Sequence, residues 1–387
     1  MNFIQTFKHE FQTIFTDTAI ILTIIGGVIL YAFLYPQPYV KQSVTGLPIS
    51  VVDYDKSDIS RNMIFKLNAT PQITVTRQDM SEQEAKDALV KEEIKAIIII
   101  PAHFKRDIIL NKRPSIAMGA DSSYFLIYGG ILEGSMKTLL TNVATLKVAK
   151  LLKKEIPLAH AKNAYTPYVL NIINLFNTQN SYTQYVVPAV FILILQQTLL
   201  IGLGILGGGL NERLRKRKKT YARTAPIFYM FLSRYLIFGL LFFVHILFYF
   251  GFSFELFHIT HLAQIEDLLA FGSLFLLASI SLGLLLGTLF NNREVATPVI
   301  LFSSLPLVFS AGFIWPVEEL PNYIVILSLL VPSTSAIHGF LALNQMGADL
   351  GMLREQQTIL LLQSIVYIVL AYIIFHYKRA KYIHNNE

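Results

Sequence analysis

Two groups of side chains have types and spacings that could hold a metal ion. His258 and His261 lie in the segment HITH, and Asp53, Asp55 and Asp58 are spaced like the first ligands of a calcium loop. No third ligand accompanies the histidines as a zinc site would require, and no glycine or closing glutamate follows the aspartates at the calcium-loop spacing. We therefore expect no metal ion. The histidines fit an outward polar loop, with zinc as the alternative, and the aspartates fit the N-terminal end of a helix.

Motifs for catalysis are missing from the sequence. The segment 204–209 (GILGGG) lacks the lysine and the hydroxyl residue of a phosphate-binding loop, so we interpret it as the end of a membrane helix. Neither HExxH nor GxSxG occurs, and the chain has no cysteine for a thiolate nucleophile, a thiolate metal site or a disulfide. We expect a protein that is not an enzyme and that binds no cofactor itself.

A few polar side chains interrupt apolar segments. Gln196 and Gln197 lie in one such segment, and Gln363 and His245 lie in two others. Glutamines at membrane depth either join helices through hydrogen bonds of about 0.6–2 kcal/mol or line a path. A lone intramembrane histidine hints at function, but a neutral histidine that bonds to a neighbouring helix is the simpler interpretation. We take Gln196 and Gln197 as candidates for a translocation path, with helix packing as the alternative.

Long segments without charge dominate the chain. Hydrophobic residues make up 53% of the sequence and charged residues 15%. A helix of about eighteen residues is about 27 Å long, close to the hydrocarbon thickness of a bilayer, and a charge at its centre costs about 2.5–3.5 kcal/mol. Six segments are long enough to cross: 18–35, 185–208, 235–254, 268–290, 295–316 and 357–377. The sequence therefore predicts an all-α membrane bundle of six helices.

Basic residues predict the orientation of these segments. They gather in the loop 211–223 and in the tail 378–387, and positively charged loops stay in the cytoplasm. Six crossings place the loop and both termini inside, whereas a seventh would place the basic tail outside. The window 320–348 has Pro332 in its middle, so we expect two short re-entrant or interfacial helices within 317–348. The net charge of +7 is densest beside a span, which argues against nucleic acid.

The first membrane helix separates two different segments. Residues 1–17 carry apolar side chains at helical spacing and predict an amphipathic helix in the membrane interface, with a plain anchor as the alternative. The first membrane helix follows at 18–36. Residues 37–182 then read as an extracytoplasmic domain, and residues 183–377 contain the other five membrane helices.

The inserted segment 37–182 alternates strand and helix patterns. Strands are predicted at 48–54, 73–76, 94–101 and 116–119. Helix patterns lie between them, which indicates an α/β layer. A long helical pattern at 124–155, a break at Pro157 and a second helix towards Phe176 predict a helical stalk. The predicted fold is thus a six-helix membrane bundle with an inserted α/β domain.

The segment after the fifth span has the features of an outward gate. It reads SAGFIWPVEELP at residues 310–321. Gly312 permits a tight turn, Trp315 suits the headgroup level, and the prolines prevent one continuous helix. The residues that we expect to form the path or its gate are Gln196, Gln197, Gly312, Trp315, Pro316, Glu318, Glu319 and Pro332.

Several separated segments resemble one family of transporters. They are the gate segment, residues 175–200 (LFNTQNSYTQYVVPAVFILILQQTLL) and the leading KHEFQTIFTDTAIIL. These look like membrane subunits of the type-2 ATP-binding-cassette (ABC) exporters. The insertion, with LPISVVDYDKSDIS, EAKDALVKEEIKAIIIIPAHFKRDI and GADSSY, is similar to that of the subgroup with a large extracytoplasmic domain between the first and second membrane helices. The resemblance covers nearly the whole chain.

This resemblance implies a permease in the bacterial inner membrane that works with partners. A separate cytoplasmic ATPase would bind and hydrolyse ATP with Mg²⁺, and a second permease copy, identical or paralogous, would complete the path. The cargo in the subgroup is typically an amphipathic drug or a lipid, and a periplasmic adaptor can receive it. The aliphatic and aromatic spans suit such a cargo better than an ion or a sugar.

The resemblance also implies where the ATPase docks. Energy would enter through the leading helix and the loop after the second span, and the candidate coupling residues are Lys8, Glu10, Asp17, Glu212, Arg213 and Thr220. That loop, NERLRKRKKTYARTAP, is more basic than the family pattern, which only Glu212 and Thr220 match. A different class of function, a membrane receptor or scaffold whose outer domain binds an envelope partner without ATP, is the alternative.

Overall fold

The computed structural model describes residues 1–40, 44–110, 112–153, 155–160, 175–177 and 181–384. The chain divides into two compact units. The helical unit comprises residues 1–42 and 174–387, and the sheet unit comprises residues 43–173. Each unit is built around hydrophobic side chains of its own.

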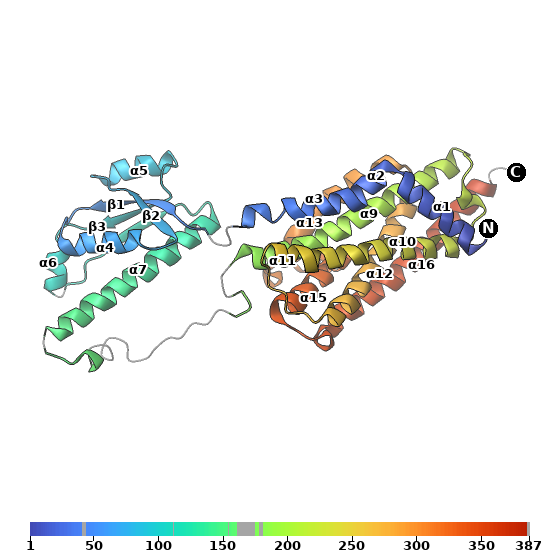
Figure 1. Ribbon diagram of the computed structural model, residues 1–387. Helices are drawn as coiled ribbons and strands as arrows, with labels where there is room; N and C mark the ends of the chain where they lie inside the picture. Colours follow the sequence, from blue (N-terminus) through green and yellow to red (C-terminus); the bar gives the residue numbers. More distant parts are fainter. Residues whose placement is uncertain (41–43, 111, 154, 161–174, 178–180, 385–387) are drawn as a thin grey trace. The chain divides into compact units, whose positions relative to one another are not determined.

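The sheet unit contains a four-stranded sheet with the strand order β2-β1-β3-β4 (Figure 1). Its strands are β1 (Leu47–Asp53), β2 (Ile73–Arg77), β3 (Ala96–Ile100) and β4 (Ala117–Ala120). β1 pairs in parallel with β2 and β3, and β4 runs antiparallel to β3. The helices of this unit are α4 (Asp58–Asn68), α5 (Glu82–Val90), α6 (Phe104–Ile109) and α7 (Phe125–Leu152). Strands form at all four positions where the sequence predicts them.

Both faces of the sheet are covered because β1 is apolar on both sides. Ile49 and Val51 pack into one core cluster with Leu67 of α4, whereas Val52 packs into a second cluster with Ala85 of α5. Continuous apolar runs are typical of strands buried on both faces. The long helix predicted at 124–155 is α7. The second stalk helix falls mostly within 161–174, outside the described residues.

Six helices in the described part of the helical unit are long and apolar enough to cross a membrane. They occupy Thr18–Tyr39, Val186–Arg215, Ile227–Leu256, Ile265–Leu289, Arg293–Ser310 and Leu350–Tyr382. A further apolar segment is broken, because α14 (Asn322–Ser328) and α15 (Pro332–Met346) meet at an angle of 87°. The six helices agree with the six membrane segments predicted from the sequence.

The membrane-spanning helices are built from α-helices joined by short turns. Besides α14 and α15, the α-helices of this unit are α1 (Phe3–Thr16), α2 (Thr18–Ile21), α3 (Val28–Leu34), α9 (Val186–Arg215), α10 (Ile227–Leu247), α11 (Phe254–Leu256), α12 (Ile265–Leu289), α13 (Ala296–Ser310) and α16 (Arg354–His384). The π-helical turns η1 (Leu22–Gly27) and η5 (Phe248–Ser253) join α2 to α3 and α10 to α11. Three 3₁₀ turns lie near the candidate sites, namely η4 (Tyr221–Arg223), η6 (Arg293–Val295) and η7 (Val317–Glu319).

α9 is the central helix of the bundle and is buried along most of its length. Its glycines allow neighbouring backbones to approach closely. A Cβ atom on Gly207 would lie 2.6 Å from the backbone of Gly287 in α12. Small residues permit such contacts between membrane helices. The segment 204–209 therefore lies inside α9, which continues to Arg215, and the interpretation of these glycines as a helix end is wrong.

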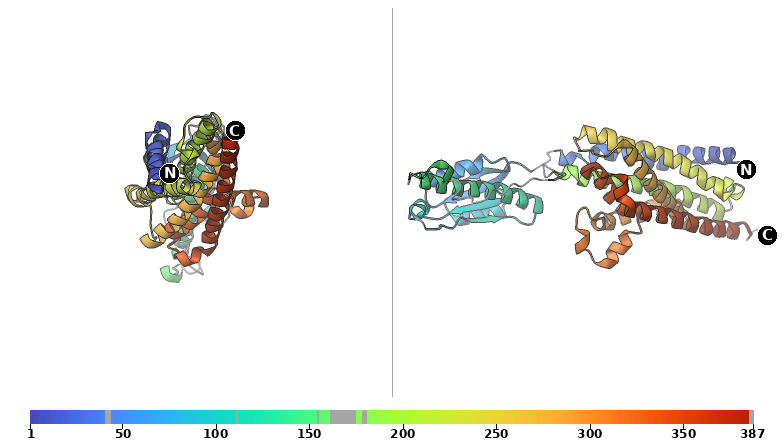
Figure 2. Two further views of the ribbon diagram at one scale, coloured as in Figure 1. Left: turned by 90° about the vertical axis from the view of Figure 1, so that its right-hand side faces the viewer. Right: turned by 90° about the horizontal axis from the view of Figure 1, so that it is seen from below.

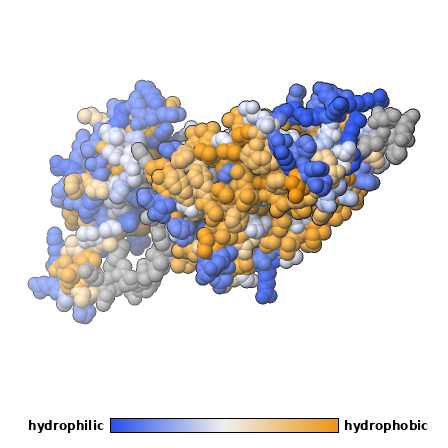
Figure 3. Space-filling view, turned by 45° about the vertical axis from the view of Figure 1, so that its right-hand side comes forward, coloured by the Kyte–Doolittle hydropathy of each residue, from blue (hydrophilic) through white to orange (hydrophobic). Residues whose placement is uncertain are grey.

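One end of the helical unit brings together α1 and the C-terminal end of α16 (Figures 1 and 2). The loop between α9 and α10 belongs to the same end, because Arg379 of α16 donates to the carbonyl of Ala225 at 2.7 Å. The turn η6 also belongs to it, because Arg293 pairs with Asp17. We call this region, residues 1–17, 211–226, 290–295 and 378–384, the charged end. The surface of the helices is hydrophobic over most of its length and becomes hydrophilic towards this end (Figure 3).

Candidate functional site

A buried ion pair fixes α1 at the charged end. The carboxylate of Glu10 accepts two hydrogen bonds of 3.1 Å from Nε of Arg234 in α10, and Nη2 of Arg234 lies 3.1 Å from Glu10 Oε1. Both side chains are almost completely buried. A buried ion pair gains little stability over an apolar pair, but the loss of one partner leaves an uncompensated charge. Each of the two residues therefore requires the other.

Tyr221 of η4 joins this pair. Its ring stacks on His9 with 5.7 Å between the ring centroids and 5° between the planes. Its hydroxyl is buried next to Glu10 and Arg234. Burial raises the pKa of Tyr221 above its ordinary value, and the Glu10 carboxylate raises it further. The phenol therefore stays neutral, and α1, η4 and α10 meet at one point.

A second cluster surrounds the elbow between α1 and α2. Oδ1 of Asp17 accepts from the backbone N–H of Ala19 at 3.1 Å and from Nη2 of Arg293 in η6 at 2.9 Å. A cavity of about 150 Å³ lies beside this pair. We call it the basic pocket, after its charged lining of Asp17, Glu212, Arg213, Lys216, Lys218 and Arg293. Its excess of cations suits a partner surface that presents carboxylates.

The C-terminal end of α12 is tied to two other helices. Nδ2 of Asn211 in α9 donates to three carbonyl groups there, at 2.8–3.1 Å, those of Gly287, Thr288 and Phe290. Nζ of Lys378 in α16 donates to the carbonyls of residues 288 and 289 at 2.8 and 3.0 Å. The last carbonyls of a helix have no partner within the helix, so these bonds fix its end. These bonds connect α9 and α16 to the segment that precedes η6.

All six predicted coupling residues lie at the charged end, in different surroundings. Lys8 is exposed on α1, and Thr220 caps η4 through its hydroxyl. The residues that line the basic pocket are Asp17, Glu212 and Arg213. Glu10 is buried, so it can position α1 but offers no surface to another protein in this arrangement.

Sequence reasoning missed Arg234, Arg293 and Asn211. Arg234 carries a signal, because it is the single charged residue within the apolar stretch 227–254 and charges at such positions are usually paired. Its partner could not be deduced, because Glu10 lies 224 residues away in the sequence. Asn211 carried no signal, since its role depends on the approach of α12.

Gln196 binds the N-terminal end of α15 inside the bundle. Its Oε1 accepts from the backbone N–H of Ser333 at 2.6 Å, and its Nε2 donates to Ser333 Oγ at 3.1 Å. The first N–H groups of a helix lack partners within the helix, and Gln196 supplies one. The side chain therefore ties α9 to α15. Gln197 is buried as well, and its amide has no hydrogen-bond partner in the described part of the chain.

The predicted gate residues lie between α13 and α15. Gly312 has a φ of 82°, and a Cβ atom there would lie 2.4 Å from Cγ2 of Val317, so the turn requires glycine. Pro316 precedes η7, and Pro332 occupies the first turn of α15, where proline is tolerated. The exposed members of the set are Trp315, Pro316, Glu318 and Glu319.

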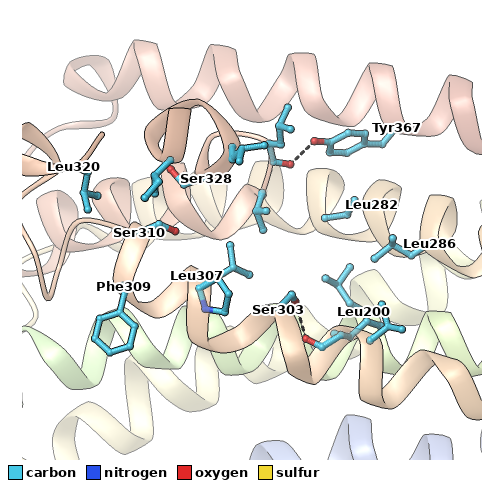
Figure 4. A pocket seen from close by; sticks show the side chains of 17 residues that line it. Leu200, Leu282, Leu286, Ser303, Leu307, Phe309, Ser310, Leu320, Ser328 and Tyr367 are labelled. Atoms are coloured by element: carbon cyan, nitrogen blue, oxygen red, sulfur yellow. Dashed lines mark hydrogen bonds between the residues drawn. The ribbon is translucent and has the colours of Figure 1, made fainter. Parts of the chain in front are cut away.

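An apolar pocket of about 700 Å³ lies between α13, α14 and α16 (Figure 4). Leucines from several helices line it, among them Leu200, Leu282, Leu286, Leu307 and Leu320. Three of its hydroxyl groups are engaged: Ser303 Oγ donates to the Ile300 carbonyl at 2.6 Å, Ser328 Oγ donates to the Val325 carbonyl at 2.8 Å, and the Tyr367 hydroxyl donates to the Leu330 carbonyl. A pocket of this size and lining suits an apolar ligand. We call it the apolar pocket.

The described side chains form no group of three histidines, aspartates or glutamates that could hold a metal ion. Asp53 instead orders the turn after β1. It accepts from the backbone N–H groups of Asp55 and Lys56, both at 3.0 Å, and from Ser60 Oγ at 2.7 Å. This aspartate acts within the turn before α4, where a carboxylate suits the start of a helix.

Comparison with known proteins identifies one family. The model of the family described as "ABC-2 family transporter protein" matches residues 18–373, nearly the whole chain. The match includes the six candidate membrane helices almost completely and also spans the sheet unit. No curated protein matches the sequence.

Proposed function

Because the chain belongs to the ABC-2 family of transporter proteins, we propose that it forms the translocation path of an ATP-driven exporter. Such a chain is the multi-pass membrane permease of an ABC transporter, and its family implies a partner ATPase subunit. The permease is a transport component and is not itself catalytic. ATP and Mg²⁺ bind to the separate ATPase, which supplies the energy for export.

The apolar pocket is the observation that supports a hydrophobic or amphipathic cargo, such as a drug or a lipid. Its walls come from four membrane helices and from α14, and the hydroxyls of Ser303, Ser328 and Tyr367 already donate to backbone carbonyls. An ion or a sugar would find few partners there, and each unsatisfied polar group would cost about 1–3 kcal/mol. Pro306 interrupts the hydrogen bonding of α13 beside the pocket, so this helix can bend when cargo enters.

The charged end is the region through which the ATPase acts. Movement of α1 reaches α10 through the Glu10–Arg234 pair and reaches η6 through Asp17 and Arg293. The turn η6 begins the segment that leads into α13, whose side chains line the apolar pocket. The ATPase presents carboxylates to the basic pocket, and Arg213 is the exposed arginine in its lining.

Replacing Arg213 with alanine is expected to weaken binding of the ATPase by about 2 kcal/mol, or about 30-fold in affinity, as for an interface hot spot. The permease complex is purified from its native membrane, and the ATPase in it is identified. Titration of the purified ATPase onto the reconstituted permease then gives the affinity. ATP hydrolysis stimulated by the permease should fall in parallel.

Arg113→Ala is the matched control, because Arg113 is an exposed arginine of the sheet unit. It should leave both the affinity and the stimulated hydrolysis unchanged. Purification of the native permease without any ATPase would contradict the proposed function itself. An unchanged affinity in Arg213→Ala would move the docking surface away from the basic pocket.

We further propose that residues 37–182 form an extracytoplasmic domain in the bacterial inner membrane, with both termini in the cytoplasm. The basic residues of the charged end support this orientation. In it, α14 and α15 form a re-entrant gate on the outer side, a second permease copy completes the path, and a periplasmic adaptor can receive the cargo. These features would place the chain in the subgroup with the large insertion.

A cysteine introduced at Ser115 is expected to react with a membrane-impermeant maleimide in intact spheroplasts. Ser115 is exposed in the sheet unit, and the native chain contains no thiol that would add background. A cysteine at Lys219, exposed in the loop of the charged end, should react only after the membrane is opened. The reverse pattern of labelling would invert the proposed orientation.

A further inference from the structure

A groove of about 520 Å³ follows the last turns of α16 at the charged end. The residues of its wall that matter here are Asn291, Ile373, Ile374, Tyr377, Lys378 and Lys381. Two ammonium groups thus stand next to two isoleucine side chains, and none of the described residues that line the groove is acidic. The groove combines a cationic part with an apolar part, and unlike the basic pocket, which also contains Asp17 and Glu212, it has no carboxylate in its described lining.

None of the ion pairs formed by the described residues neutralises the positive charge in the groove. Nζ of Lys378 donates to the carbonyls of Thr288 and Leu289 and, at 3.1 Å, to Oδ1 of Asn291. These bonds use the three donors of the ammonium group, but all three acceptors are uncharged. Lys381 lies one turn further along, is exposed, and takes part in none of the ion pairs of the described residues. The groove therefore attracts an anion.

An apolar stripe continues from the groove along α16. It consists of the exposed residues Leu362, Val366, Val369, Ile373 and Tyr377, at spacings that place them on one face of the helix. The stripe is about 22 Å long at 1.5 Å per residue, longer than the roughly 15 Å of hydrocarbon in one leaflet, so an acyl chain can lie along it for its whole depth. Tyr377 lies between the apolar stripe and the lysines, where aromatic residues mark the boundary between lipid and water.

We propose that this groove binds one anionic phospholipid of the leaflet next to the charged end. Its phosphate contacts Lys381 and Tyr377 above the Lys378 ammonium, and an acyl chain follows Ile373, Val369 and Val366. The charge complementarity selects an anionic headgroup, and the apolar stripe beside the two lysines selects a lipid over a soluble phosphate.

A lipid at this position would also touch the end of α12. Lys378 donates to Asn291, which lies just before η6, and Arg293 of η6 pairs with Asp17. The bound lipid would therefore restrict the movement of η6, which lies between the proposed ATPase surface and α13. This consequence rests on the proposed function, whereas the binding of the lipid does not.

Native mass spectrometry of the full chain tests the binding with phosphatidylglycerol as the probe and phosphatidylcholine as the neutral reference. Lys381→Gln should weaken retention of the first phosphatidylglycerol about fivefold, and Lys381→Glu about 30-fold, as expected for one and two units of charge near a membrane surface. Lys219→Glu, an exposed lysine of the same end, is the control and should change retention less than twofold. Ile373→Ser should weaken retention through the acyl chain, whereas Leu361→Ser, at an exposed leucine on another face of α16, should not.

Each other result would overturn the inference. Equal losses in Lys381→Glu and Lys219→Glu would indicate diffuse attraction to a basic surface. Equal retention of phosphatidylcholine would remove the headgroup contact, and displacement of the lipid by glycerol 3-phosphate at the same concentration would reduce the groove to a phosphate site. Unfolding midpoints measured in phosphatidylcholine alone should be the same for all variants, which separates the loss of lipid from the loss of fold.

Discussion

Replacing Glu10 with glutamine is expected to lower the free energy of unfolding by about 3–5 kcal/mol. The reason is that Arg234 would remain buried without a charged partner. Removing one side of a buried ion pair destabilises a protein by about this amount. The side chains are almost fully inaccessible, so water cannot compensate the guanidinium. Reversible unfolding of the purified protein in mixed detergent micelles, followed by circular dichroism, measures the loss.

Two further variants separate this effect from a general weakness of α1. Lys8→Gln changes an exposed charge of the same helix and should alter the stability by less than about 0.5 kcal/mol. The double variant Glu10→Leu with Arg234→Met replaces the ion pair with an apolar pair and should recover most of the loss, because such exchanges are often neutral. If Glu10→Gln were as stable as Lys8→Gln, the buried pair would not hold α1 in solution.

The elements that depend on local pattern could be predicted from the sequence. The apolar segments at 48–54 and 94–101 become β1 and β3, since a short β-branched run between turn residues has few other solutions. The six membrane segments follow from length and absence of charge in the same way. Pro332 also acts as expected, because α15 begins at this residue.

The contacts that build the candidate sites could not be predicted, because they join distant parts of the chain. The family resemblance predicts Glu10 at an interface with the ATPase, yet Glu10 is buried against Arg234. The sequence allows Gln196 either a place in the path or a role in helix packing, and in the structure Gln196 binds the end of α15. A single sequence shows that a polar residue lies at membrane depth, but the neighbour that satisfies it depends on how the helices pack.

Replacing Gly207 with alanine is expected to cost about 1–3 kcal/mol of stability, and valine at this position should cost more. The added Cβ atom would lie 2.6 Å from Cα, C and O of Gly287, and backbone atoms cannot rotate away as a side chain can. α9 and α12 would have to separate, which would also strain the bonds from Asn211 to the end of α12. Stimulated ATP hydrolysis should therefore fall together with the unfolding free energy.

Gly209→Ala, two residues further along the same helix, provides a control of opposite sign. A Cβ atom at Gly209 would meet only Cβ of Arg293, at 3.9 Å, which is an ordinary van der Waals contact. Alanine is favoured over glycine within a helix by up to about 1 kcal/mol, so this variant should be as stable as the native protein or more stable. The same unfolding measurement applied to both variants shows whether their free energies of unfolding change in opposite directions. If both substitutions changed the stability in the same direction, the backbone contact between α9 and α12 would not determine how these two helices pack.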